Sequence, residues 1–71
     1  MAKAQILKVE QPLSTAQVTA QLRRYGAHLR ADKSTETRRI FYSGSTRLWI
    51  QLLSLGYGDA YALEYYASCP C

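Results

Sequence analysis

Residues 38–66, with the sequence RRIFYSGSTRLWIQLLSLGYGDAYALEYY, carry seven of the chain's eight aromatic side chains and five of its nine leucines. A chain of 71 residues has room for one domain, whose single core supplies only roughly 3–5 kcal/mol of stability. Most of that core must come from this segment, so the way it folds decides the architecture. We expect one domain over residues 1–68 and a flexible C-terminal tail at residues 69–71.

The first half of the sequence predicts a strand, a capped helix and a second strand. Apolar and polar residues alternate with a period of two in AQILKVE, which is typical of a half-buried strand. Ser14 then marks a helix start, because Gln17 follows at the spacing of a capping box, and Gly26 marks the helix end. AHLRAD alternates again. If it prolonged the helix instead, Gly26 inside that helix would cost about 1 kcal/mol, so we expect a strand.

The second half repeats this plan. RRIFYSG predicts a strand, Ser45 or Thr46 caps a helix through RLWIQLLSL that Gly56 ends, and DAYALEYYA alternates as a last strand. In so short a chain, the order β-α-β-β-α-β predicts a small ferredoxin-like α+β domain. Its antiparallel four-stranded sheet would have the strand order 4-1-3-2, with two helices on one face and the other face open.

Two known families share parts of this pattern. The order of elements and a first helix ending in RRYG resemble the RNA-recognition motif over most of the chain, a likeness that implies RNA binding on the open sheet face. Where that family has its aromatic signature, on the third strand, this chain has RRIFYSG with one stacking residue. Separately, LLSLGYGDAYALE is similar to the helix–LGG–strand ending of the small basic phycobilisome linkers, with one more residue between the glycines.

The predicted second helix is apolar over more of its circumference than one packed face requires. On a helical wheel its apolar residues cover about 220°, whereas a packed stripe needs only somewhat over about 100°. Either a neighbouring loop covers the excess or a partner does, and exposed apolar patches often mark interfaces. We therefore take Leu48, Ile50 and Leu55 as candidate partner-binding residues, and a homodimer through this helix is one form such an interface could take.

The open face of the predicted sheet supplies further candidates. Alternation along the strands turns Phe41 outward among cations, which suits stacking on bases and equally suits a protein interface built on aromatic residues and arginine. A shift of one residue would instead turn Phe41 to the core and Ile40 outward. The partner-binding candidates on this face are Lys8, Arg30, Arg39, Phe41 and Tyr66.

Charge and composition favour a soluble protein with an acidic partner. The net charge is +4 and the isoelectric point is near 9.3, which suits nucleic acid or an acidic protein surface. No apolar run approaches the roughly 20 residues of a membrane span, and MAKAQILKVE lacks the apolar segment of a secretory signal. We expect a cytoplasmic protein with no membrane partner.

The sequence offers little that could carry catalysis or hold a metal. The single histidine, His28, has no cysteine within reach along its element, and the five acidic residues are scattered. We expect no enzyme activity, no cofactor and no metal site. Cys69 and Cys71 are too close in sequence to form a disulfide framework, so we expect free thiols in a frayed tail; an intermolecular disulfide or adventitious metal is the alternative.

Two classes of function remain. The first is a protein-interaction module, such as an adaptor, an assembly linker or an inhibitor, which binds a larger acidic protein through the second helix or the open sheet. The second is an RNA or single-stranded DNA binder that uses the open sheet. We favour the first, because a nucleic-acid face usually carries more than one stacking aromatic residue.

Overall fold

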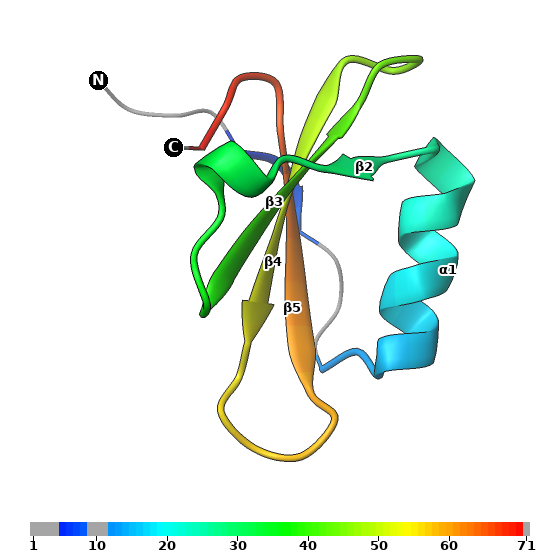
Figure 1. Ribbon diagram of the computed structural model, residues 1–71. Helices are drawn as coiled ribbons and strands as arrows, with labels where there is room; N and C mark the ends of the chain where they lie inside the picture. The colour runs from blue at the N-terminus through cyan, green and yellow to red at the C-terminus, as the bar shows by residue number, and fades with distance from the viewer. Residues whose placement is uncertain (1–4, 9–11, 71) are drawn as a thin grey trace.

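One helix lies against one face of a five-stranded antiparallel sheet in the computed structural model, which describes residues 5–8 and 12–70 (Figure 1). The strand order is β1-β5-β4-β3-β2, and every pair of neighbours is antiparallel. The elements are β1 (Gln5–Lys8), α1 (Thr15–Tyr25), β2 (His28–Leu29), the 3-10 helix η1 (Ala31–Lys33), β3 (Arg38–Ser43), β4 (Leu48–Ser54) and β5 (Tyr61–Tyr66). The α+β class is confirmed.

The second predicted helix is wrong: RLWIQLLSL forms the central strand β4. Residues 44–47 close a hairpin between β3 and β4, in which Ser43 lies opposite Leu48. With β3 and β5 paired along its two edges, β4 lies inside the sheet, and its middle residues Ile50 and Gln51 are buried on opposite faces. This burial on both faces explains why apolar residues cover a wide arc when the same segment is drawn on a helical wheel. The predicted homodimer through a second helix is therefore wrong, because residues 48–54 form a strand.

The predicted strand order 4-1-3-2 is also wrong, although two of its three pairings form. The last strand, β5, does lie beside β1, and β3 does lie beside β2. The pairing of the first strand with the third does not form, because β4 fills the space between β5 and β3. The ferredoxin-like arrangement therefore gives way to a sheet with one more strand and one helix fewer.

The first helix begins and ends where the sequence predicts. Ser14 is the N-cap: its hydroxyl accepts from the Gln17 amide at 3.2 Å, and its own amide donates to the Gln17 side chain at 2.8 Å. Gly26 ends the helix with φ 60° and ψ 35°, a left-handed conformation that glycine adopts without steric cost. The predicted strand after Gly26 is shorter than expected, since only His28–Leu29 pairs with β3 before η1 begins.

A carboxylate in the loop between β4 and β5 accepts hydrogen bonds from the first residue of α1. Asp59, in the loop between β4 and β5, accepts from the Thr15 amide at 3.1 Å and from the Thr15 hydroxyl. These hydrogen bonds lower the pKa of Asp59, as a negative charge beside a helix N-terminus should. The β4–β5 loop is thereby fixed against the helix.

The core lies between α1 and the sheet. Val18 of α1 packs with Ile50, Leu63 and Tyr65 of β4 and β5, and the Tyr25 and Tyr65 rings lie 5.3 Å apart at 59°. On β5, Tyr61, Leu63 and Tyr65 face this core. On β3 the predicted alternation is wrong by one residue, because Phe41 packs toward this core while Ile40 faces away.

At the C-terminal end, the expectation of a free Cys69 thiol is wrong. Cys69 is disulfide-bonded, and Cys71 lies outside the described residues. Pro70 is buried. The domain boundary at residue 68 and the mobility of residues 69–71 stay predictions. Within the described ranges, no helix has both the length and the apolar character needed to cross a membrane.

Removal of the Ser14 hydroxyl should lower the free energy of unfolding by about 1 kcal/mol, because Ser14→Ala leaves the Gln17 amide without its acceptor. Urea melts followed by circular dichroism measure the change. Thr19→Ala, on the exposed middle of α1, is the matched control and should leave the midpoint nearly unchanged. Equal midpoints for wild type and Ser14→Ala would mean that the cap does not form.

Tyr65 should make the fold less stable in strong alkali. Burial, followed by the neighbouring Tyr25, raises the pKa of Tyr65 from 10.0 to about 12, so the native fold favours the neutral phenol. Its contribution to stability is therefore complete below pH 10.0 and is lost as the pH rises toward 12. Denaturant melts between these values should show a decline that is smaller in Tyr65→Phe. The same decline in both proteins would contradict the assignment.

Candidate functional site

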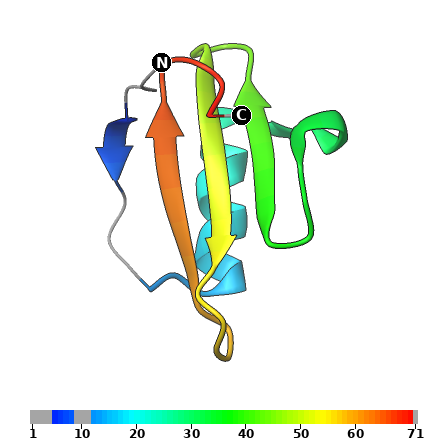
Figure 2. The ribbon, with the colours of Figure 1, turned by 90° about the vertical axis from the view of Figure 1, so that its left-hand side faces the viewer.

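The sheet face away from α1, here called the open face, is turned toward the viewer in Figure 2. Three rows of side chains across β3, β4 and β5 form it. Its position follows from alternation, because the neighbouring residues on each strand pack toward α1. The rows are Tyr42–Trp49–Tyr66, Ile40–Gln51–Glu64 and Arg38–Leu53–Ala62.

The first of these rows, Tyr42, Trp49 and Tyr66, is called the aromatic row. The Tyr42 and Trp49 rings lie 4.6 Å apart at 47°. The guanidinium of Arg30 lies 5.5 Å from the centre of the Trp49 ring, a cation–π contact. Arg30 is held there by its amide, which donates to the Ile40 carbonyl at 2.8 Å, and by an ion pair of 3.2 Å with Asp32. Arg30 and Tyr42 thus both contact the Trp49 ring.

The middle row contains a buried polar network. Gln51 is only 7% exposed, and its side-chain amide donates to Glu64 Oε1 at 2.8 Å. The Tyr66 hydroxyl donates to the same oxygen at 2.9 Å. Burial and this hydrogen bond raise the pKa of Tyr66, since both favour its neutral form. The carboxylate of Glu64 is thus turned inward to the protein's own donors.

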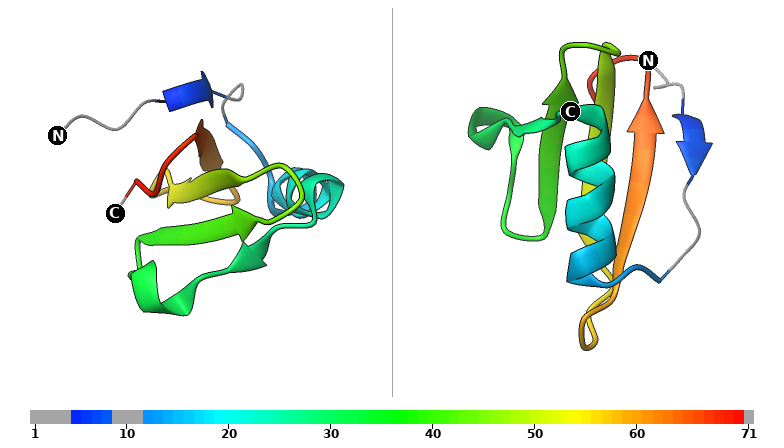
Figure 3. Two further views of the ribbon diagram at one scale, coloured as in Figure 1. Left: turned by 90° about the horizontal axis from the view of Figure 1, so that it is seen from above. Right: turned by 90° about the vertical axis from the view of Figure 1, so that its right-hand side faces the viewer.

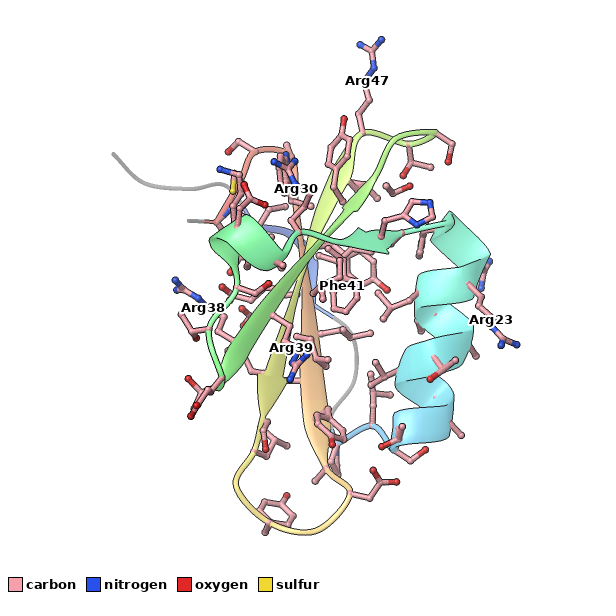
Figure 4. The ribbon with its side chains drawn as sticks, viewed as in Figure 1. Arg23, Arg30, Arg38, Arg39, Phe41 and Arg47 are labelled. Atoms are coloured by element: carbon pink, nitrogen blue, oxygen red, sulfur yellow. The ribbon has the colours of Figure 1, made fainter. Side chains whose placement is uncertain are left out.

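Cations outnumber available anions on the surface. Asp32 pairs with Arg30, Asp59 accepts from Thr15, and Glu64 accepts from Gln51 and Tyr66. Across the described ranges, Arg30–Asp32 is the one ion pair, so the other guanidinium groups have no carboxylate partner there. In Figure 4, Arg38 extends on the open-face side, Arg47 extends from the β3–β4 turn and Arg23 lies on the outer side of α1.

The residues predicted on a second helix lie elsewhere. Ile50 is 0% exposed and belongs to the core under α1, and Leu48 packs half-buried against the same core. Leu55 follows the end of β4, half-buried, with its amide bonded to the Ala60 carbonyl at 3.0 Å. These three side chains do not form one exposed surface, because the helix that would have grouped them is a strand.

The residues predicted on the open sheet are divided between its two faces. Arg30 and Tyr66 lie on the open face as expected. Phe41 packs toward the core, and Arg39 is exposed on the α1 side, both because of the shift of one residue on β3. The backbone of Lys8 lies opposite Glu64, and its side chain lies outside what the structure describes.

Sequence reasoning missed Arg38, Tyr42 and Trp49, which the structure brings to the open face with Arg30 and Tyr66. A signal for them existed in the segment SGSTR, whose small polar residues and glycine stand between two apolar runs and are typical of a hairpin. Had RLWIQLL been taken as the second strand of that hairpin, alternation would have placed Trp49 and Gln51 on one face.

The arrangement is suited to binding on a surface. No pocket is formed by the described residues, and no three of their His, Cys, Asp or Glu side chains gather as metal ligands. What the open face presents is aromatic rings, the Leu53 side chain and arginine, the residue types that anchor protein interfaces.

Glu64→Leu should lower the free energy of unfolding by about 1–3 kcal/mol, because the buried Gln51 amide loses its acceptor. Glu64→Gln is the matched control: it keeps an oxygen acceptor and should be milder. Chemical denaturation of the three proteins measures both effects. A Leu variant as stable as the Gln variant would show that the network contributes nothing.

Comparison with known proteins leaves the chain without an assigned family. No family model, no curated protein and no solved structure matches it. A function for the protein must therefore be argued from the open face and from the distribution of charge around it.

Proposed function

We propose that this protein is a non-enzymatic interaction module, an adaptor, assembly linker or inhibitor, that binds a larger acidic protein through its open face. The observation that carries the proposal is the surplus of cations without carboxylate partners. Within the described chain one ion pair forms, Arg30–Asp32, while the carboxylates of Asp59 and Glu64 are engaged by the protein's own donors. Binding of an acidic surface at the open face would neutralise Arg38, which extends on that side.

The open face is the favoured contact surface because it combines charge with apolar area. Arg38 stands at the end of a row that continues into Leu53, and the aromatic row lies four residues further along β3. Tyrosine, tryptophan and arginine dominate the energetics of protein interfaces, since each buries a large area and keeps a polar group for orientation. The exposed outer side of α1, in contrast, carries mainly small and polar residues around Arg23 and Arg24.

A protein partner is favoured over bases because the best stacking ring is already engaged. Base stacking requires an accessible ring face. Trp49 is half-buried, has the Arg30 guanidinium 5.5 Å from its centre and has the Tyr42 ring at 4.6 Å. A protein partner can instead contact the rings at their edges and the arginine at its free donors.

RNA or single-stranded DNA is the second candidate, and the aromatic row favours it. The row places three rings beside arginine on one sheet face, the combination by which open sheets stack bases and neutralise phosphates. The difference between the two candidates is measurable, because nucleic-acid binding would weaken steeply with salt as counterions are released.

Arg38→Gln should weaken binding of a labelled poly-L-glutamate probe by about 1–2 kcal/mol, roughly 5- to 30-fold, because the open face loses a free cation. Arg23→Gln is the matched control: it removes the same charge from the far side of α1 and should change binding less than about twofold. Fluorescence anisotropy measures both variants, and nuclease-treated lysate captured on the same variants should show the same ranking.

An oligouridylate of equal charge completes this experiment. Tighter binding of oligouridylate than of poly-L-glutamate, with a steep salt dependence and a loss in Arg38→Gln, would replace the acidic protein by single-stranded nucleic acid. Equal effects of Arg38→Gln and Arg23→Gln would remove the open face as the binding surface.

A further inference from the structure

The C-terminal segment, residues 67–70, folds back over the open face and is called the strap. It leaves the end of β5, turns and crosses in front of β4 (Figure 2). Seen from above, it lies on the side of the sheet away from α1 (left panel of Figure 3). Ala67 and Ser68 are exposed at the turn, whereas Cys69 is half-buried and Pro70 is buried. The strap therefore packs onto the protein instead of extending into solvent.

The open face is more deeply buried near the strap than a sheet without a covering helix should be. Ile40 is 0% exposed and Gln51 is 7% exposed, although both point away from α1. On one side, the loop that contains η1 is tied down through Ser34, whose hydroxyl donates to the Arg30 carbonyl at 2.8 Å and accepts from the Ile40 amide at 2.9 Å. On the other side, the backbone of the strap crosses in front of β4 (Figure 2).

We propose that the strap is an autoinhibitory cover of the open face, which a partner must displace in order to reach the aromatic row. This inference rests on the proposed function, because it concerns access to the same surface. The pairing of β5 ends at Tyr66, so displacement of the strap breaks no pairing of the sheet, and the disulfide of Cys69 is the covalent link that such a movement must leave in place. Short segments outside the sheet open at a lower free energy than the sheet itself.

The apparent affinity for a partner is then the affinity of the open state multiplied by the fraction of molecules in which the strap is open. Removal of the strap should raise the apparent affinity by the inverse of that fraction. Residues 68–71, SCPC, carry no charged side chain, so their removal takes away the disulfide of Cys69 but leaves the number of charged side chains unchanged. A gain in affinity on its removal would accordingly reflect access and not added charge.

Trp49 reports on the strap without any partner, because it is the only tryptophan in the chain and lies in the aromatic row. A variant that ends at Ala67 should show a red-shifted Trp49 emission and stronger quenching by acrylamide than the full chain. Pro70→Ser, which keeps the full length and charge, should shift both signals in the same direction. Ser68→Ala, at the exposed turn, is the matched control and should match the wild type.

The same proteins are then titrated with labelled poly-L-glutamate. We expect the shortened chain to bind at least about threefold more tightly than the full chain, with Pro70→Ser between them. Unchanged Trp49 emission and quenching in both variants would show that the strap does not cover the row. Exposure of Trp49 without tighter binding would show a cover that does not inhibit. Failure of the proposed function itself is separate, because it appears in the full chain as equal effects of Arg38→Gln and Arg23→Gln.

Discussion

Burial of β4 from both sides is the constraint on which the rest of this fold depends. Neighbouring residues of β4 point to opposite faces: Ile50 is buried under α1, and Gln51 is buried on the open face. A strand of this kind needs a neighbour along each edge and a cover over each face, because its backbone and its apolar side chains must both leave water. The hairpin with β3 and the pairing with β5 supply the edges, and α1 covers one face.

The two faces of β4 are covered by different means, and this difference shapes the surface that we propose for binding. On the α1 side, a regular helix contributes aliphatic and aromatic contacts that fix the sheet. On the open face, the η1 loop is tied down through Ser34, and the backbone of the strap crosses in front of β4. Loops and chain ends move more readily than packed helices, so the molecule combines one permanently closed face with one that can open.

Local signals in the sequence were sufficient for α1. Ser14, Gln17 and Gly26 define α1 because caps are formed by neighbours in sequence. The segment from Leu48 to Ser54 was mispredicted because leucine is a good helix former, and a run that is apolar on both sides has no clear period of two. Its strand conformation is imposed by β3 and β5. The same error removed Trp49 from the predicted sheet, and a shift of one residue on β3 exchanged Phe41 for Tyr42, so the candidate site was predicted only at Arg30 and Tyr66.

The pairing of the first strand with the last has a consequence for synthesis of the chain on the ribosome. β1 lies opposite β5, so Gln5 faces Tyr66 across almost the entire length of the sequence. The hairpin of β3 and β4 can form as soon as its own residues emerge, but β4 then still lacks its second neighbour. Until β5 emerges, one edge of that apolar strand is unpaired, and β1 has nothing to join. A nascent chain stalled before residue 61 would therefore present an apolar strand edge to chaperones.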